Sequence, residues 1–353
     1  MTGAKSTTIS SVHSISEASK SSTGKVTSTS VSTTTGKGSS LPKTSSASET
    51  YGVPSGKPTS TVPTAKGLDK DFPDNVPCTE FPSDYGAIPV EYMNLGGWIG
   101  VQVPNIATAA GFDDIETMVS NLCDGEDCCV EGAFCSYACP PGYQKSQWPK
   151  TQGTTGQSIG GIQCRSGMLR LTNPDEKRLC IPGAKEVNIQ VENKLNGSVA
   201  ICRTDYPGTE GMTIPLETYP GDVAPLTCPD QKTYYQWQGK STSGQYYVNN
   251  LNVPAFDACQ WSDGEEPIGN WAPLNLGVGY ANGAAYLAIF QNRPTTYSRL
   301  GFSVEIVAKH MSGKCKYSHG KYCKGDDYQD CNDNDGCTVA VSSGNATFVL
   351  SYD

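Results

Sequence analysis

Residues 129–139 have the sequence CVEGAFCSYAC, and Cys164 follows after a further twenty-four residues. The chain holds 15 cysteines, and none lies in the first 77 residues. Thiols at this density in a reducing compartment would need metals, but the matching histidines and ligand spacings are missing. Disulfides in an oxidising compartment explain them better. Because 15 is odd, we expect seven bridges and one remaining Cys. The adjacent Cys128 and Cys129 should bond to different partners, since a vicinal bridge strains the backbone.

Strand patterns dominate the sequence on the C-terminal side of this motif. Few crossover helices separate the strands, which argues against a parallel α/β sheet. We therefore predict an all-β fold, mainly an antiparallel β-sandwich, with a disulfide-rich N-terminal part and few short helices. A distant similarity of layout adds a thaumatin-like sandwich as one form of this prediction. The predicted strands are short β-branched or aromatic runs bounded by Asn, Gly and Pro: Val187–Val191, Tyr246–Val248, Ala285–Phe290, Phe302–Val307, Thr338–Val341 and Thr347–Leu350.

Other segments complete this prediction. Residues 106–122 are the one plausible helix of the cysteine-rich part, with Gly111 as a weak point. The glycines at 277, 279 and 283 lack the strand and helix that flank a nucleotide-binding loop, so they predict a turn. The expected domain spans 74–353, with a Cys-rich part (74–183), a sandwich part (184–310) and a Cys-containing C-terminal hairpin region (311–353).

Residues 1–73 form a low-complexity tract rich in Ser and Thr. Such a segment cannot bury enough apolar surface to fold, so we expect a disordered, O-glycosylated stalk. A plain flexible linker is the alternative. The first residues, MTGAKS, lack the apolar core of a signal peptide, so we expect the chain to begin downstream of one. No apolar run is long enough to span a membrane. The sequons at Asn196 and Asn345 predict N-glycosylation and fit a secreted protein.

Composition excludes several function classes. The net charge of -9 and the pI of about 4.9 disfavour binding to nucleic acids and anionic membranes, whereas a neutral glucan is indifferent to charge. Three histidines leave little material for a catalytic triad or a His-rich metal site. Residues 330–336 resemble a calcium loop, but the glycine is displaced and Val341 replaces the bidentate glutamate. We expect no metal and no cofactor.

The cysteine spacing C-x5-C-x3-C-x24-C resembles the signature of the fungal SUN family, glycoside hydrolase family 132. The resemblance covers roughly Cys78 to the C-terminus. It implies a secreted cell-wall protein that acts on β-1,3-glucan during wall remodelling, septation and cell separation. The resemblance also implies that the signature cysteines Cys129, Cys135, Cys139 and Cys164 form disulfides. Residues 106–128 and the loop 315–337 depart from the family pattern, so disulfides and specificity should differ there. The other matching blocks are FCSYACPP (134–141), KSQWP (145–149), CRTDYPGTE (202–210), YYQWQG (234–239), QYYVNN (245–250) and GNWAPLNLGVGY (269–280).

Hydrolysis of a glycosidic bond normally takes two carboxyl groups. Asp205 and Glu210 flank a Tyr-Pro-Gly turn that would aim both side chains at one cleft, so we predict them as the catalytic pair. Their amide variants are expected to keep the fold. The alternative is structural: Asp205 caps the turn and Glu210 is solvated. The reserve candidates are Glu217, Asp222 and Asp257.

Aromatic and amide side chains predict the sugar-binding surface. Pyranose rings stack their apolar CH faces on flat aromatics, while amides bind the hydroxyls. The alternative is that half or more of these aromatics fill the core. Trp148 is a further candidate that would otherwise cover the cysteine cluster. The predicted substrate-binding residues are Trp237, Tyr247, Trp271, Asn270 and Tyr280.

Two functional hypotheses follow. The preferred one is a β-1,3-glucan-active glycoside hydrolase, and the other is a non-catalytic glucan-binding wall protein. Two carboxyl groups about 5 Å or 6.5–9.5 Å apart in an aromatic groove would favour the enzyme. A flat aromatic strip without such a pair would favour the binding protein.

Overall fold

The computed structural model of the chain describes residues 65–104, 115–118, 128–150, 152, 158–206 and 212–353, all within the unit Gly56–Asp353. The last residues of the Ser/Thr-rich tract already take part in this fold. Phe72 is buried, Leu68 packs beside the same core, and the Phe72 amide donates a hydrogen bond to the Lys177 carbonyl (2.9 Å). The folded part therefore begins before residue 74.

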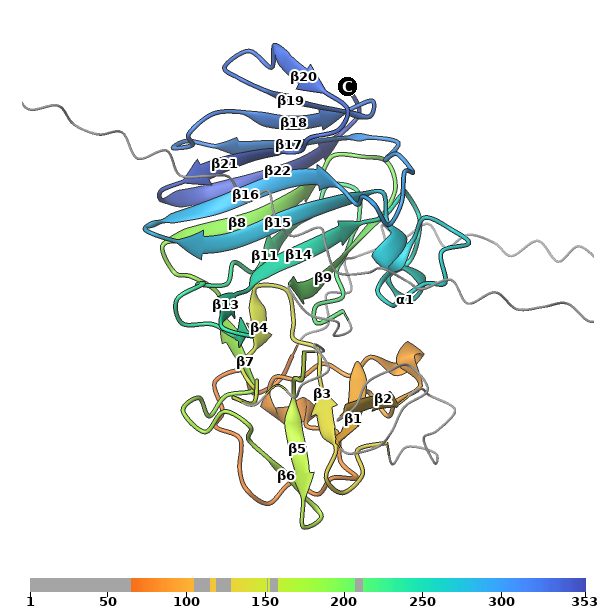
Figure 1. The fold of residues 1–353 in the computed structure, drawn as a ribbon, viewed down its shortest axis with the longest axis vertical. Coiled ribbons are helices and arrows are strands. Elements are labelled where there is room, and N and C mark those ends of the chain that lie inside the picture. Colours follow the sequence, from red (N-terminus) through yellow and green to blue (C-terminus); the bar gives the residue numbers. More distant parts are fainter. Residues whose placement is uncertain (1–64, 105–114, 119–127, 151, 153–157, 207–211) are drawn as a thin grey trace, which may run out of the picture. The chain divides into compact units, whose positions relative to one another are not determined.

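Two large sheets share one hydrophobic core and form the predicted β-sandwich, whose strands are labelled in Figure 1. The first, here the β14 sheet, has the order β10-β9-β14-β15-β16-β21. Its strands are β9 (Val199–Tyr206), β10 (Glu217–Thr218), β14 (Ser243–Val248), β15 (Leu274–Ala281), β16 (Ala284–Gln291) and β21 (Cys337–Val341). The second, the β22 sheet, has the order β11-β8-β22-β17-β18-β19-β20. Its strands are β8 (Val187–Asn193), β11 (Val223–Leu226), β17 (Ser303–Ala308), β18 (Cys315–Ser318), β19 (Lys321–Lys324), β20 (Asp330–Asn332) and β22 (Gly344–Ser351).

Alternation of side chains along the strands builds this core. In β16, Leu287 and Ile289 are buried between the sheets, while Tyr286 points to the opposite side and is exposed. In β22, Phe348 and Leu350 are buried in the same cluster. Successive side chains of a strand face opposite ways, and each large apolar side chain buried this way contributes about 1.5–3 kcal/mol. The all-β prediction is confirmed, and each of the predicted strands lies in or overlaps an observed one.

Residues after 311 belong to the sandwich. Strand β22 lies in the middle of its sheet, where it pairs in parallel with β8 (Ala346 opposite Ile189) and antiparallel with β17. Strand β21 closes the other sheet beside β16. The two sheets therefore depend on the C-terminal segment for one central strand and one edge strand.

The predicted glycine turn is mostly wrong. Gly277 and Gly279 lie inside β15, which forms a hairpin with β16, and only Gly283 lies in the turn. Asn282 and Gly283 both have positive φ, at 52° and 82°, as a tight two-residue hairpin turn requires. A Cβ at Gly279 would stand 3.1 Å from Gln231 Nε2, so a small residue fits the strand there.

The cysteine-rich part has a sheet of its own, in the order β2-β1-β3-β5-β6. Part of the predicted helix 106–122 is wrong, because Ile115–Met118 is strand β2 and pairs antiparallel with β1. The rest of that stretch lies outside the described residues. These strands are β1 (Gly100–Pro104), β2 (Ile115–Met118), β3 (Phe134–Ser136), β5 (Ile162–Arg165) and β6 (Met168–Arg170). Two small sheets pair β4 (Tyr143–Lys145) with β7 (Cys180–Pro182) and β12 (Gln236–Trp237) with β13 (Lys240–Ser241).

Helical structure is sparse in the described residues. The α-helix α1 (Ala255–Ala258) is accompanied by three 3-10 turns: η1 (Ser83–Tyr85), η2 (Glu91–Met93) and η4 (Gly269–Trp271). This agrees with the prediction of few short helices.

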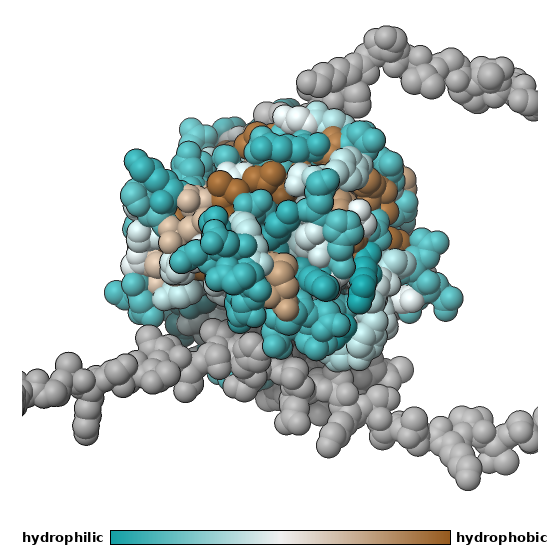
Figure 2. All heavy atoms as spheres, turned by 90° about the horizontal axis from the view of Figure 1, so that it is seen from above, coloured by the Kyte–Doolittle hydropathy of each residue, from teal (hydrophilic) through white to brown (hydrophobic). Residues whose placement is uncertain are grey.

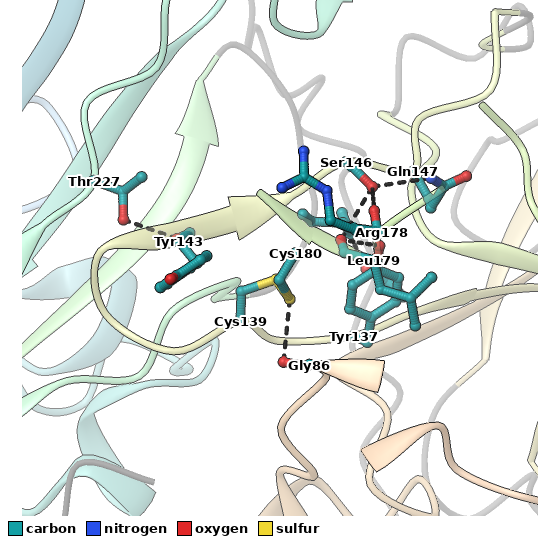
Figure 3. Close-up of a disulfide and its surroundings, with 12 residues drawn as sticks. Gly86, Tyr137, Cys139, Tyr143, Ser146, Gln147, Arg178, Leu179, Cys180 and Thr227 are labelled. Carbon is teal, nitrogen blue, oxygen red and sulfur yellow. Dashed lines mark hydrogen bonds between the residues drawn. A yellow bond between two sulfur atoms is a disulfide. The ribbon is translucent and has the colours of Figure 1, made fainter. Parts of the chain in front are cut away.

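Disulfides crosslink both the cysteine-rich part and the sandwich. Cys128 is bonded as well, but not to its neighbour, because Cys129 pairs with Cys135. Cys228 is the one free cysteine among the described residues, and it is buried. Figure 3 shows the Cys139–Cys180 bridge beside the β4–β7 pair, where Tyr137 donates a hydrogen bond to the Leu179 carbonyl (2.6 Å). The described bridges are Cys78–Cys164, Cys129–Cys135, Cys139–Cys180, Cys202–Cys259, Cys315–Cys337 and Cys323–Cys331.

One face of the molecule is mostly polar (Figure 2). Figure 2 shows one face on which hydrophilic residues prevail and hydrophobic ones form small separate areas. In the described part of the chain, none of the helices has the length and apolar character needed to cross a bilayer.

Candidate functional site

A buried ion pair on β9 forms the centre of the candidate site. Arg203 and Asp205 stand two residues apart on the strand, so both side chains face the same side of the sheet. Arg203 Nη2 donates a hydrogen bond to Asp205 Oδ1, and both side chains are buried (0% and 1% exposed). Arg203 also donates to Gln144 Oε1 on β4, at 3.0 Å. The site thereby joins a sandwich strand to the β4–β7 pair.

Tyr234 connects this pair to the backbone of Lys145. Its hydroxyl lies 3.3 Å from Asp205 Oδ2 and 3.1 Å from the Lys145 carbonyl, and it accepts from Trp148 Nε1 (3.3 Å). Lys145 is fully buried, and its Nζ donates to Ser136 Oγ (2.6 Å) and lies 4.1 Å from the centre of the Trp148 ring. A cation over an indole face at this distance is stabilising.

Aromatic rings surround these charges. Trp148 stacks on Tyr235 with ring centroids 4.0 Å apart and meets Tyr234 edge-on at 6.3 Å. Trp237 packs against this group from β12 and is partly buried. Its indole Nε1 is buried and has no hydrogen-bond partner in the described residues. Trp148, Tyr234, Tyr235 and Trp237 are called the Trp148 group below.

The charge state of the centre follows from this geometry. Burial alone would lower the pKa of Arg203, but the Asp205 carboxylate outweighs burial and raises it above its usual value. Arg203 therefore stays protonated and places a positive charge in contact with Asp205. A glycosidase acid normally lies in apolar surroundings. The Asp205 carboxyl group, hydrogen-bonded to a guanidinium, is thus a poor match for the proton donor.

This geometry argues against two expectations about Asp205. It does not merely cap a turn, since it is half of a buried ion pair. Its amide variant should not keep the fold unperturbed, because it would leave Arg203 without its counter-charge. Glu210, the other member of the predicted pair, lies outside the described residues.

The reserve carboxylates have structural surroundings of their own. Glu217 accepts a hydrogen bond from the Ala255 amide at the start of α1 (3.0 Å), and Asp222 accepts from the Tyr219 amide (2.9 Å). Asp257 lies within α1, which packs on the far side of β9. None of the three contacts Asp205 within the described residues.

The predicted sugar-binding residues do not converge on one cleft. Only Trp237 belongs to the Trp148 group. Tyr247 is 7% exposed and packs in a separate cluster with Cys202 and Cys259. Tyr280 packs at the edge of the sandwich core.

Asn270 and Trp271 hold a loop. Asn270 Oδ1 accepts from the Ser262 amide (2.7 Å), and Trp271 Nε1 donates to the Ser262 carbonyl (3.2 Å). A Cβ at Gly264 would stand 2.7 Å from the Trp271 ring, so this indole is packed tightly against the loop backbone. The loop carries Trp261, which is 43% exposed and meets Tyr247 edge-on at 6.5 Å.

The predicted glycosylation sites lie on the surface, and the four signature cysteines are bonded. Asn196 and Asn345 are both exposed, so the surface is open to glycosylation at both sequons. Cys129, Cys135, Cys139 and Cys164 are all disulfide-bonded, and only Cys129 and Cys135 bond to each other. The described residues hold no group of three potential metal ligands.

Sequence reasoning missed Arg203, Lys145 and the central place of Tyr234. One signal was available: an arginine two residues before an aspartate on one strand puts both on the same face. The contacts to Gln144 and Lys145 join segments far apart in the chain, so no local sequence pattern predicts them.

Comparisons with known proteins identify the family. The model of the SUN family, described as beta-glucosidase, matches residues 73–339. The chain belongs to the SUN family. A secreted beta-glucosidase of Aspergillus fumigatus is 55% identical over 290 residues, which is 81% of this chain and 67% of that protein. A secreted beta-glucosidase of Candida albicans is 44% identical over 285 residues, 80% of this chain and 62% of that protein. The SUN-family chain thus matches about two thirds of the length of these relatives.

No solved structure matches this SUN-family chain. The sandwich itself is confirmed by the strand pairing, and its thaumatin-like form stays a prediction.

Proposed function

We propose that this SUN-family chain is a secreted glycosidase that hydrolyses β-1,3-glucan in the fungal cell wall, with roles in wall remodelling, septation and cell separation. The observation that carries the proposal is the Asp205 carboxyl group, fixed between Arg203 and Tyr234 beside the Trp148 ring. The relatives named secreted beta-glucosidases support the same reaction class. A fixed carboxyl group is one of the two that glycoside hydrolysis through an oxocarbenium-like transition state normally uses.

The two predicted carboxyl groups take different roles in this proposal. Asp205, in contact with the Arg203 guanidinium, serves as the nucleophile or base, and Glu210 serves as the proton donor. At 1% exposure the Asp205 carboxylate cannot touch a sugar in the described conformation. Direct attack therefore requires a movement that exposes it.

A non-catalytic glucan-binding protein is the second candidate. It is favoured by the surroundings of Glu217, Asp222 and Asp257, which serve the backbone or α1 and not Asp205. It is also favoured by exposed aromatic side chains such as Trp261. A rigid disulfide-bonded platform would suit such a protein outside the cell.

Product analysis on a reduced laminari-oligosaccharide separates the two candidates. The wild-type chain should release shorter products, and Glu210→Gln should lower turnover by about 10²–10⁴-fold, the usual loss for a positioned acid or base. Glu266→Gln is the matched control, because Glu266 is exposed on a loop. Equal turnover in the two folded variants would remove Glu210 from the mechanism. No product from any folded form would favour the binding protein.

A further inference from the structure

The outer face of the β14 sheet is not used by the proposed reaction. In β16 the inward side chains Ala285, Leu287 and Ile289 are fully buried, so Tyr286, Ala288 and Phe290 face outward. Tyr286 is 43% exposed, among the more exposed aromatic side chains of the chain. Asp205 and Arg203 instead lie on the inner face of this sheet. The Arg203 charge interacts there with Tyr246 of the core.

Small residues form the surface between the outward rings of Tyr286 and Phe290. Ala288 stands opposite Gly277 of β15 on one side and Thr338 of β21 on the other. A Cβ at Gly277 would lie 3.4 Å from Phe290 Cε1, so the Phe290 ring extends over the glycine of the next strand. Tyr286 and Phe290 are four residues apart, which corresponds to roughly 13 Å along a strand. Two rings thus flank a floor of methyl groups and glycine.

On β14, β15, β16 and β21 this face carries no charge at its outward positions, in a protein with 61 charged residues (26 Lys and Arg plus 35 Asp and Glu). An outward carboxylate, Glu217, stands at the far edge of the sheet, where β10 pairs with β9. The corresponding outer face of the β22 sheet differs, since Glu192, Glu305 and Lys316 occupy its outward positions. The outward residues of the β14 sheet on β14, β15, β16 and β21 are Ser243, Gln245, Tyr247, Asn275, Gly277, Gly279, Ala281, Ala284, Tyr286, Ala288, Phe290, Thr338 and Ala340.

A further exposed ring lies beyond the buried end of this face. Phe290 lies in the same cross-strand row as Asn275 and Tyr247, which are both buried (1% and 7% exposed), so the open part of the face ends at Phe290. Tyr247 in turn meets Trp261, which is fixed by the loop contacts of Asn270 and Trp271 described above. The exposed rings are therefore presented on a rigid framework and lose little freedom when a ligand binds.

We propose that this outer face is a glucan-binding surface, on which a neutral β-linked glucan chain lies across β16 with its sugar rings on Tyr286 and Phe290. Apolar CH faces of the sugars would cover the rings, while Gln245 and Thr338 at the margins bind hydroxyls. The absence of charge on the four strands around Tyr286 and Phe290 fits a neutral polysaccharide and disfavours an acidic or basic protein partner. This binding proposal depends on the proposed function only for the identity of the polysaccharide.

Pull-down of the full chain with insoluble β-1,3-glucan tests the surface. Tyr286→Ala should weaken binding about tenfold, the effect of one lost ring stack by analogy with base stacking. Ala288→Lys should weaken it similarly, because it raises a charged side chain from the floor. Tyr352→Ala is the matched control: this tyrosine is 50% exposed but follows β22 of the other sheet. Binding of the control should equal that of the wild type, independently of salt.

Turnover of a soluble reduced oligosaccharide separates this proposal from the proposed function. Tyr286→Ala should keep that turnover while losing binding to insoluble glucan. If no form shows turnover but Tyr286→Ala still loses binding, the surface stands and the enzyme proposal falls. Wild-type binding by folded Tyr286→Ala and Ala288→Lys would overturn the surface. A change only in self-association, measured by size-exclusion chromatography, would assign the face to a second copy and also overturn it.

Discussion

Removing the charge of Asp205 should destabilise the fold, whatever its role in catalysis. Asp205→Asn leaves the fully buried Arg203 guanidinium without its counter-charge. Breaking a buried pair from one side typically costs about 3–5 kcal/mol, a large part of the roughly 5–15 kcal/mol of a folded domain. The Gln144 and Thr227 oxygens remain near Arg203, at 3.0 and 3.4 Å, but neither carries a charge. We therefore expect a loss of about 3 kcal/mol.

Denaturant unfolding under non-reducing conditions, followed by tryptophan fluorescence, measures this loss. The informative control removes both charges: Arg203→Met with Asp205→Leu replaces the pair by apolar side chains, which is often close to neutral in stability. The double variant should therefore recover at least half of the stability that Asp205→Asn loses. An Asp205→Asn protein within about 1 kcal/mol of the wild type, or a double variant less stable than the single one, would refute this reasoning.

Three further predictions concern other parts of the fold. Burial of Glu176 would raise its pKa, but the hydrogen bonds and charge of Arg178 lower the pKa below its usual value. The Glu176 carboxylate therefore stabilises the fold above about pH 4.3, the usual pKa of an unfolded glutamate, and this stabilisation is lost as the pH falls through the folded pKa. Glu176→Gln should cost about 1 kcal/mol at pH 7, and urea titrations should show the difference shrinking below pH 4. Burial raises the pKa of the Cys228 thiol to about 12, so a thiol reagent at pH 8 should label the native chain slowly and one cysteine per chain after unfolding without reductant; fast native labelling would count against this. Gly161→Ala should lower the free energy of unfolding by more than about 3 kcal/mol, because its Cβ would stand 2.0 Å from the Cys135 carbonyl oxygen. Gly167 also has a positive φ but faces open space, so Gly167→Ala should lower it by only about 1 kcal/mol in the same unfolding assay.

The sandwich was predictable because most core strands alternate apolar and polar residues. Strand β16 is a clear case, with Leu287 and Ile289 inward and Tyr286 outward. Strand β9 was missed for a physical reason: its inward positions include Arg203 and Asp205, and charged residues there break the pattern that marks a buried face. Strand β15 was missed because its outward glycines resemble a turn.

The candidate site was predictable only in part. Asp205 stood out beside a Tyr-Pro-Gly turn, and Trp237 among aromatic residues, and both lie at the centre or margin of the observed cluster. The partners that set their chemistry come from distant segments, as in the contact of Tyr234 with the Lys145 carbonyl. Such contacts depend on how the β4–β7 pair meets β9, and no local sequence pattern encodes that arrangement.

One measurement tests the central claim most directly. The full chain is incubated with insoluble β-1,3-glucan, and the same tube is assayed for bound protein and for soluble sugar released over time. A glucan-active glycosidase should bind and release sugar, and Glu210→Gln should bind as well as the wild type while releasing about 10²–10⁴-fold less. Binding without release by the folded wild-type protein would contradict the enzyme and leave a glucan-binding wall protein.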